Sequence, residues 1–184
     1  GNNMEGFLRA DGRIGIRNTL VVVYLVECAH HVARTIVSKM DQDSIQLIGF
    51  PGCYPNDYSL QMMEKLCTHP NVGGVVLVSL GCEGFIREKL CQTITDSKRP
   101  VETLIIQKCG GTKTTIDLGI EKASSILTEI ASAERAELTT EDLVIGTICG
   151  GSDGTSGISA NPAVGVCFDM LLNNGATCIF EEPG

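Results

Sequence analysis

Short apolar runs alternate with helix-like segments along most of the chain. The run TLVVVYLV at 19–26 is continuous and rich in β-branched residues, which is typical of a strand buried on both faces. Further strands are expected at 44–50, 71–81, 101–107, 142–148 and 176–182, and helices at 28–40, 56–69, 85–94, 114–138 and 160–175. Strands and helices in alternation indicate right-handed βαβ crossovers. We therefore predict an α/β fold, Rossmann-like and doubly wound, with a mostly parallel sheet of about six strands.

The domain organisation follows from the same pattern. Residues 1–18 fit no regular element well, so we expect an N-terminal arm or hairpin there. Residues 19–184 show no linker and no low-complexity tract, and a chain of 184 residues is long enough for one full core. We predict a single α/β domain over 19–184.

Composition excludes several classes of partner. The net charge of −8 disfavours nucleic acid and membrane surfaces as partners, and the apolar runs are too short to span a bilayer. No secretory signal pattern is visible. The nine cysteines are odd in number and include no C-x-x-C pair, which favours reduced thiols over a disulfide framework or a zinc ribbon. We expect a cytoplasmic protein.

Four glycine- and cysteine-rich segments each follow a predicted strand. They read PGCYPND (51–57), LGCEG (80–84), KCGGTKTT (108–115) and CGGSDGTSG (149–157). In a parallel sheet the carboxyl ends of the strands share one edge, where ligands of open α/β sheets bind. Glycines permit close backbone approach, and the helix N-termini that follow present free N–H groups. The sequence therefore predicts a pocket for a small anion at this edge.

The N-terminal stretch FLRADGRIGIRN (7–18) supplies further candidates for anion binding. It contains Arg9, Arg13 and Arg17, followed by Asn18, and guanidinium groups bind carboxylates in a bidentate manner. Established phosphate-binding and serine-hydrolase signatures are not matched: GGTKTT lacks the P-loop spacing, and GGSDG has only the skeleton of G-x-S-x-G.

Three segments together resemble the altronate/galactarate dehydratase family, which also includes the large subunit of sulfolactate sulfo-lyase. They are GFLRADGRIGIRN (6–18), HPNVGGVVLVSLGCE (69–83) and CGGSDGTSGISANPAVG (149–165). Because family members continue well beyond a segment like IFEEPG (179–184), the chain looks like the first half of the large catalytic region. The resemblance implies as partners the C-terminal half of the enzyme, a small N-terminal domain or subunit, and further copies in a homo-oligomer. Family members usually carry a histidine in the loop where this chain has Phe50 and Pro51.

The resemblance implies a lyase that eliminates water from a hydroxy acid substrate, such as altronate or galactarate, to give a 2-keto-3-deoxy acid. It also implies a divalent metal, Fe²⁺ or Mn²⁺, to stabilise the enediolate as a Lewis acid. On this interpretation three groups transfer protons: Asp153, Glu83 and Lys113. The expected substrate-binding residues are Arg9, Arg13, Arg17, Asn18, Gly150, Gly151, Ser152, Ser156 and Asn161. The expected metal ligands are among Cys53, Cys82, Cys109 and Cys149.

Three hypotheses remain open from the sequence. The first is the dehydratase, with carbon–sulfur elimination from sulfolactate as its close variant. The second is a noncatalytic anion-binding domain. The third is a thiol or iron–sulfur redox protein, which the lack of paired-cysteine spacing disfavours.

Overall fold

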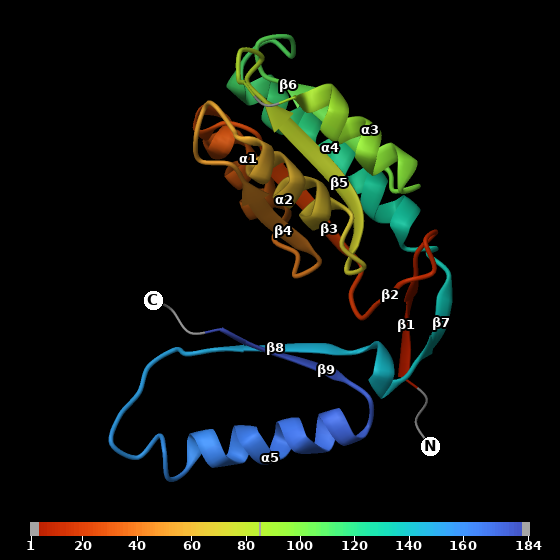
Figure 1. Ribbon diagram of the computed structural model, residues 1–184. Coiled ribbons are helices and arrows are strands. Elements are labelled where there is room, and N and C mark those ends of the chain that lie inside the picture. The colour runs from red at the N-terminus through yellow and green to blue at the C-terminus, as the bar shows by residue number, and fades with distance from the viewer. Residues whose placement is uncertain (1–3, 85, 182–184) are drawn as a thin grey trace. The chain divides into compact units, whose positions relative to one another are not determined.

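The computed structural model describes residues 4–84 and 86–181 (Figure 1). Contacts gather the chain into two compact units: a large unit of residues 5–136 and a small unit of residues 137–184 with residues 1–4. This grouping differs from the predicted single domain over 19–184. Phe85 and the chain ends at 1–3 and 182–184, which some of the expected elements include, lie outside the described residues.

The core of the large unit is a four-stranded sheet in the order β4-β3-β5-β6. Its strands are β3 (Thr19–Tyr24), β4 (Ile45–Gly49), β5 (Val72–Ser79) and β6 (Val101–Ile105). All three pairings are parallel, and Val22 of β3 lies between Leu47 of β4 and Val76 of β5. Every residue of β5 is buried, as expected of a strand covered on both faces.

Two helices cover each face of this sheet. The helices are α1 (Glu27–Met40), α2 (Asp57–Cys67), α3 (Arg87–Asp96) and α4 (Thr112–Ile130). Val22 and Val76 pack with α1 and α4 in one buried cluster, while Val21 and Leu77 pack with α2 and α3 in the other. Because side chains alternate along a strand, each apolar run supplies both cores. The predicted Rossmann-like, doubly wound α/β class is confirmed.

The N-terminal residues form a hairpin. Strands β1 (Met4–Leu8) and β2 (Ile14–Gly15) pair antiparallel, and β7 (Arg135–Leu138) completes a separate sheet in the order β2-β1-β7. The sequence pattern predicted a helix through residue 138, but α4 ends at Ile130. Residues 135–138 become extended because β1 offers them backbone partners, and the Arg135 guanidinium lies 3.7 Å from the centre of the Phe7 ring.

The small unit contains one βαβ crossover. A short 3₁₀ turn (Thr140–Asp142) precedes β8 (Val144–Ile148), α5 (Ala160–Asn173) and β9 (Thr177–Glu181). Strands β8 and β9 pair in parallel with each other in a two-stranded sheet of their own. The central sheet therefore has four strands in the described residues, and the expectation of about six is corrected. Periodicity predicted the strands, but strand pairing joins distant segments and is not encoded in any local pattern.

None of the helices in the described part of the chain combines the length and apolar character needed to cross a bilayer.

Candidate functional site

Three predicted site loops lie side by side at the carboxyl edge of the large unit's sheet. They follow β4, β5 and β6. The Gly84 N–H donates to the Cys53 carbonyl at 2.9 Å, which joins the first two loops, and the Gln107 N–H donates to the Leu80 carbonyl at 3.2 Å, which joins the last two. This edge of the sheet is therefore a continuous rim of loop backbone, as the parallel topology predicts.

Gly81 shows why this rim needs glycine. Its φ of +124° lies where residues with a side chain are strained, and an added Cβ would approach Gln107 Oε1 to 2.6 Å. The loop after β5 consequently turns tightly against the loop after β6.

A buried polar network fixes the loop after β5. Glu83 accepts hydrogen bonds from the Ser79 hydroxyl and, through Oε2, from the Gly81 N–H at 2.8 Å. Arg87 Nη1 donates to Ser79 Oγ at 2.8 Å and to Glu83 Oε1 at 3.2 Å. The Glu83 side chain is only 1% exposed, so its charge is paired and hydrogen-bonded out of water.

This network sets the protonation of Glu83. Burial alone would raise the pKa of Glu83, but hydrogen bonds from Ser79 and the backbone, with the charge of Arg87, outweigh burial and lower it. Glu83 is therefore an ionised anchor of the loop, and its lone pairs already face protein donors. Ser79 and Arg87 were missed as site residues, although the E-x-x-x-R spacing of Glu83 and Arg87 is a visible ion-pair signal.

The third loop of the rim leads into helix α4. Gly110 and Gly111 have φ of +87° and +103°, and nothing lies within 4 Å of a Cβ placed on Gly111. Lys113, a predicted proton-transfer residue, is exposed in the first turn of α4. Its ammonium group and the N-terminal end of the helix both contribute positive potential at the rim.

The loop cysteines were predicted as metal ligands. Cys53 and Cys82 are exposed, Cys109 is partly buried, and Cys149 is exposed in the small unit. In residues 4–84 and 86–181, no group of three or more His, Cys, Asp or Glu side chains is arranged to hold a metal ion. The donor set within either unit therefore does not fit a metal centre, and the divalent metal stays a prediction for the family.

His30 lies in the first turn of α1, after β3. Its ring stacks on Tyr24 with a centroid separation of 4.3 Å, and Nδ1 lies 3.1 Å from Glu27 Oε1. These contacts place an imidazole at the carboxyl end of β3, the strand that pairs with β4 on one side and β5 on the other.

The small unit holds the fourth predicted loop, between β8 and α5. Asp153 Oδ1 accepts from the N–H and the hydroxyl of Thr155, both at 2.7 Å, and the Asp153 N–H donates to Ser156 Oγ at 2.9 Å. The Asn161 N–H donates to the Ser156 carbonyl at 2.9 Å. The structure thus brings Asp153, Ser156 and Asn161 together around one turn.

The rest of this loop is open. Cys149 Sγ and Ser152 Oγ lie 3.7 Å apart, and nothing is within 4 Å of a Cβ placed on Gly150 or Gly151. The Thr155 hydroxyl, followed by its backbone N–H, lowers the pKa of Asp153. Asp153 is therefore an exposed carboxylate that stays ionised at neutral pH.

The N-terminal arginines lie at the other edge of the large unit's sheet, where the strands begin. Arg9 donates to the Pro70 and Arg17 carbonyls at 2.6 and 3.0 Å and to Asn18 Oδ1 at 3.0 Å. Asn18 in turn donates to the Ile130 carbonyl at 2.7 Å. Arg9 and Asn18 thus connect the hairpin to the chain before β5 and to the end of α4.

Arg13 and Arg17 occupy the same edge of the sheet. Arg13 pairs with Asp11 at 2.7 Å and donates to the Thr68 carbonyl at 2.8 Å, and Arg17 is exposed. The motif is therefore structural at this edge in the large unit, and it does not contribute to the rim of loops after β4, β5 and β6. Its predicted contact with substrate stays a prediction.

The fold and the rim define an α/β protein of the doubly wound class with a loop site at the carboxyl ends of its strands. The sequence matches the pattern of the D-galactarate dehydratase/altronate hydrolase second domain over residues 6–131. It matches the D-galactarate/altronate dehydratase C-terminal pattern over residues 140–183. The chain belongs to the D-galactarate dehydratase/altronate hydrolase family, as its resemblance indicated.

Individual relatives agree with this assignment. Altronate dehydratase of Escherichia coli (strain K12) is 28% identical over 96% of this chain, and galactarate dehydratase (L-threo-forming) of the same organism is 29% identical over 99%. The (2R)-sulfolactate sulfo-lyase subunit beta of Chromohalobacter salexigens is 29% identical over 99% of the chain. The aligned stretch spans 38%, 39% and 47% of these relatives, respectively. The family is one of enzymes, and the chain corresponds to part of its longer members.

Proposed function

We propose that this chain forms part of a hydro-lyase that removes water from a sugar acid such as altronate or galactarate to give a 2-keto-3-deoxy acid. The observation that carries the proposal is the family match across both units, since the relatives with that match include named altronate and galactarate dehydratases. The three-loop rim supports it, because it offers backbone N–H groups and an exposed lysine to an anionic substrate.

The reaction needs a base, an acid and groups that hold the substrate. A base removes the proton next to the carboxylate, the neighbouring C–O bond breaks as that oxygen receives a proton and leaves as water, and the enol product becomes the 2-keto acid. Asp153 fits the base among this chain's residues, because it is exposed and ionised at neutral pH. Lys113 lies on the rim of the large unit, and its predicted role in proton transfer stays a separate prediction.

The other predicted residues fit supporting roles. Ser152, Ser156 and Asn161 would orient substrate hydroxyls, and Gly150 and Gly151 leave space for a substrate carboxylate near the backbone. Glu83 fits a positioning role better than proton transfer, because it fixes the loop that carries Cys82. The divalent metal predicted for the family supplies none of these roles, because the described donors of neither unit fit a metal centre, and the roles of Asp153 and Lys113 require only side chains.

A panel of substrates tests this function. The full-length protein that contains this sequence would be incubated with altronate, galactarate and sulfolactate, with and without Fe²⁺ or Mn²⁺, and 2-keto acid would be measured. Asp153→Asn is expected to lower kcat at least about 100-fold, the usual size of a general-base contribution. Asp169→Asn, which changes an exposed aspartate on α5, is the matched control and should retain activity.

The outcomes separate the hypotheses. A 2-keto product from a sugar acid that is lost in Asp153→Asn supports the dehydratase. Sulfite release from sulfolactate would instead support carbon–sulfur elimination, which the likeness to the sulfo-lyase subunit favours as the second candidate. Thermal stabilisation by sugar acids without product from any of them would contradict both and indicate a binding domain.

A further inference from the structure

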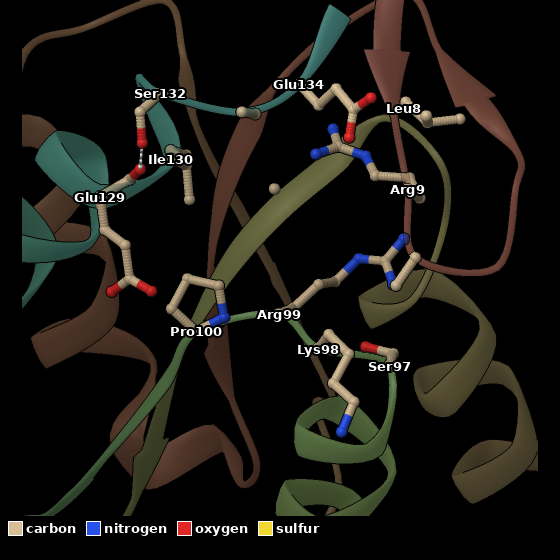
Figure 2. Close-up of a pocket in the computed structure, with 13 residues that line it drawn as sticks. Leu8, Arg9, Ser97, Lys98, Arg99, Pro100, Glu129, Ile130, Ser132 and Glu134 are labelled. Carbon is tan, nitrogen blue, oxygen red and sulfur yellow. Dashed lines mark hydrogen bonds between the residues drawn. The ribbon is translucent and has the colours of Figure 1, made fainter.

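A second pocket lies at the amino edge of the sheet, away from the loop rim. Its cavity of about 280 Å³ is bounded by the end of β1, the start of β5, the turn before β6 and the last turn of α4 (Figure 2). Three basic side chains line it: Arg9, Lys98 and Arg99. In the view of Figure 2 they lie along one side, with Glu129 on the other.

The two arginines are buried without an acidic partner. Arg9 is 8% exposed and Arg99 is 6% exposed. Arg99 donates from Nε to the Val72 carbonyl at 2.8 Å and from Nη2 to the His69 carbonyl at 3.1 Å. Arg9 likewise bonds only neutral oxygens, and across residues 4–84 and 86–181 neither guanidinium lies within 4.0 Å of a carboxylate. Two like charges out of water without a counter-charge are costly.

The charges also act on each other. Burial and then the nearby charge of Arg99 lower the pKa of Arg9 to about 10, and Asp11 offsets this only in part. Asp11 itself is engaged with Arg13. Asp11, which does not border the cavity, therefore does not neutralise the positive charge of Arg9.

One donor remains available. Nη1 of Arg99 makes no hydrogen bond with protein among the described residues. In the same residues, every side-chain nitrogen that is fully buried has a hydrogen-bond partner. Nη1 is therefore accessible, and Arg99 borders the cavity. Lys98 also borders the cavity and adds an exposed ammonium group. The backbone of Lys98 has a φ of +62°.

Acceptors at the opposite wall restrict the ligand. Helices α3 and α4 both end at this pocket, which brings carbonyl oxygens and the negative ends of two helix dipoles, and Glu129 and Glu134 are exposed at the border. These groups disfavour a bare anion such as chloride. They accept hydrogen bonds from an anion that also carries O–H groups.

We propose that this pocket binds a small hydroxyl-bearing oxyanion, such as hydrogen phosphate or a hydroxy acid, through Arg99 Nη1, Arg9 and Lys98. The oxyanion supplies an ion-pair partner for the two arginines, and its O–H groups face the helix carbonyls and Glu129. The site is independent of the rim and does not rest on the proposed dehydratase activity.

The test measures binding of inorganic phosphate and of tartrate by calorimetry and by thermal shift, at constant ionic strength set with chloride. Stabilisation beyond the chloride reference by either probe is expected, and comparing the two distinguishes a phosphate site from a carboxylate site. Lys98→Gln should weaken the apparent affinity about threefold, and Glu129→Gln should strengthen it about twofold, as expected for single charges near a surface. Both residues are exposed, so both variants should fold.

Matched controls complete the experiment. Lys65→Gln and Glu121→Gln change exposed charges that do not border the cavity, and neither should alter binding. The proposal is overturned if neither probe stabilises the protein beyond chloride. It is also overturned if Lys98→Gln and Lys65→Gln change affinity equally, because binding would then follow net charge and not this pocket.

Discussion

The two units contain the same strand–helix–strand pattern but bury it to different extents. Every residue of β5 in the large unit is buried, whereas β8 and β9 in the small unit are mostly exposed, with Phe180 70% exposed. Helix α1 buries four residues, but α5 buries only Phe168 although its sequence is more apolar. An apolar pattern therefore establishes what an element can bury, and neighbouring elements decide whether it is buried.

We expect the largest difference in the free energy of unfolding between a truncated buried side chain in the large unit and a truncated exposed side chain in the small unit. Leu77→Ala removes a fully buried side chain from β5 and should lower the free energy of unfolding by about 2–5 kcal/mol, through lost transfer energy and a cavity. Ile179→Ala in β9 removes a half-exposed side chain and should change it by less than about 1 kcal/mol.

Urea unfolding monitored by circular dichroism, with amide hydrogen exchange to resolve the units, measures both effects. Equal losses for the two variants would break the comparison, because they would mean that β9 is packed as closely as β5.

A smaller difference is expected between glycines of the two loop systems. Gly81→Ala forces a side chain onto a φ of +124° and against Gln107, which should cost about 1–3 kcal/mol. Gly151→Ala meets no atom within 4 Å, so its effect should stay within about 0.5 kcal/mol. Thermal unfolding of each variant gives the comparison, and a neutral Gly81→Ala would show that the loop after β5 is free to rearrange.

The smallest effect concerns the acid dependence of stability. The pKa of Glu83 is lower in the folded state than its unfolded value of about 4.5. The ionised Glu83 therefore stabilises the fold fully above pH 4.5, and this stabilisation is lost as the pH falls through the pKa of the folded state. Glu83→Gln should cost about 1–2 kcal/mol at pH 7 and should flatten the decline in stability below pH 4.5.

Stability curves from pH 7 to pH 3 test this effect. Asp153→Asn is the comparison from the small unit: its carboxylate is exposed, so the same change should alter the curve less. An unchanged acid profile in Glu83→Gln would contradict the role assigned to the Ser79–Glu83–Arg87 network.

Much of the large unit could be predicted from local sequence. The β-branched run at 19–26 became β3, and the expected strands at 44–50, 71–81 and 101–107 became β4, β5 and β6. The three loops after β4, β5 and β6 lie together because parallel topology requires it. Local patterns were sufficient in this unit because burial on both faces gives an unambiguous signal.

The errors arose where distant partners decided the structure. The stretch at 135–138 has helix-forming residues but is extended because β1 pairs with it. The sequence did not reveal that Arg9 donates hydrogen bonds to the Pro70 and Arg17 carbonyls. Its predicted contact with substrate stays a prediction. The predicted proton transfer by Glu83 stays a prediction, and its contacts with Ser79 and Arg87 are visible only in the structure.

The sequence by itself determined the α/β class, the family and the positions of the glycine- and cysteine-rich loops, because these depend on periodicity, turn chemistry and motif order. The tertiary structure decided which strands share a sheet, which charges are paired and which apolar faces are covered. Those properties arise between segments far apart in the chain. Their free energies depend on what surrounds a residue as well as on what the residue is.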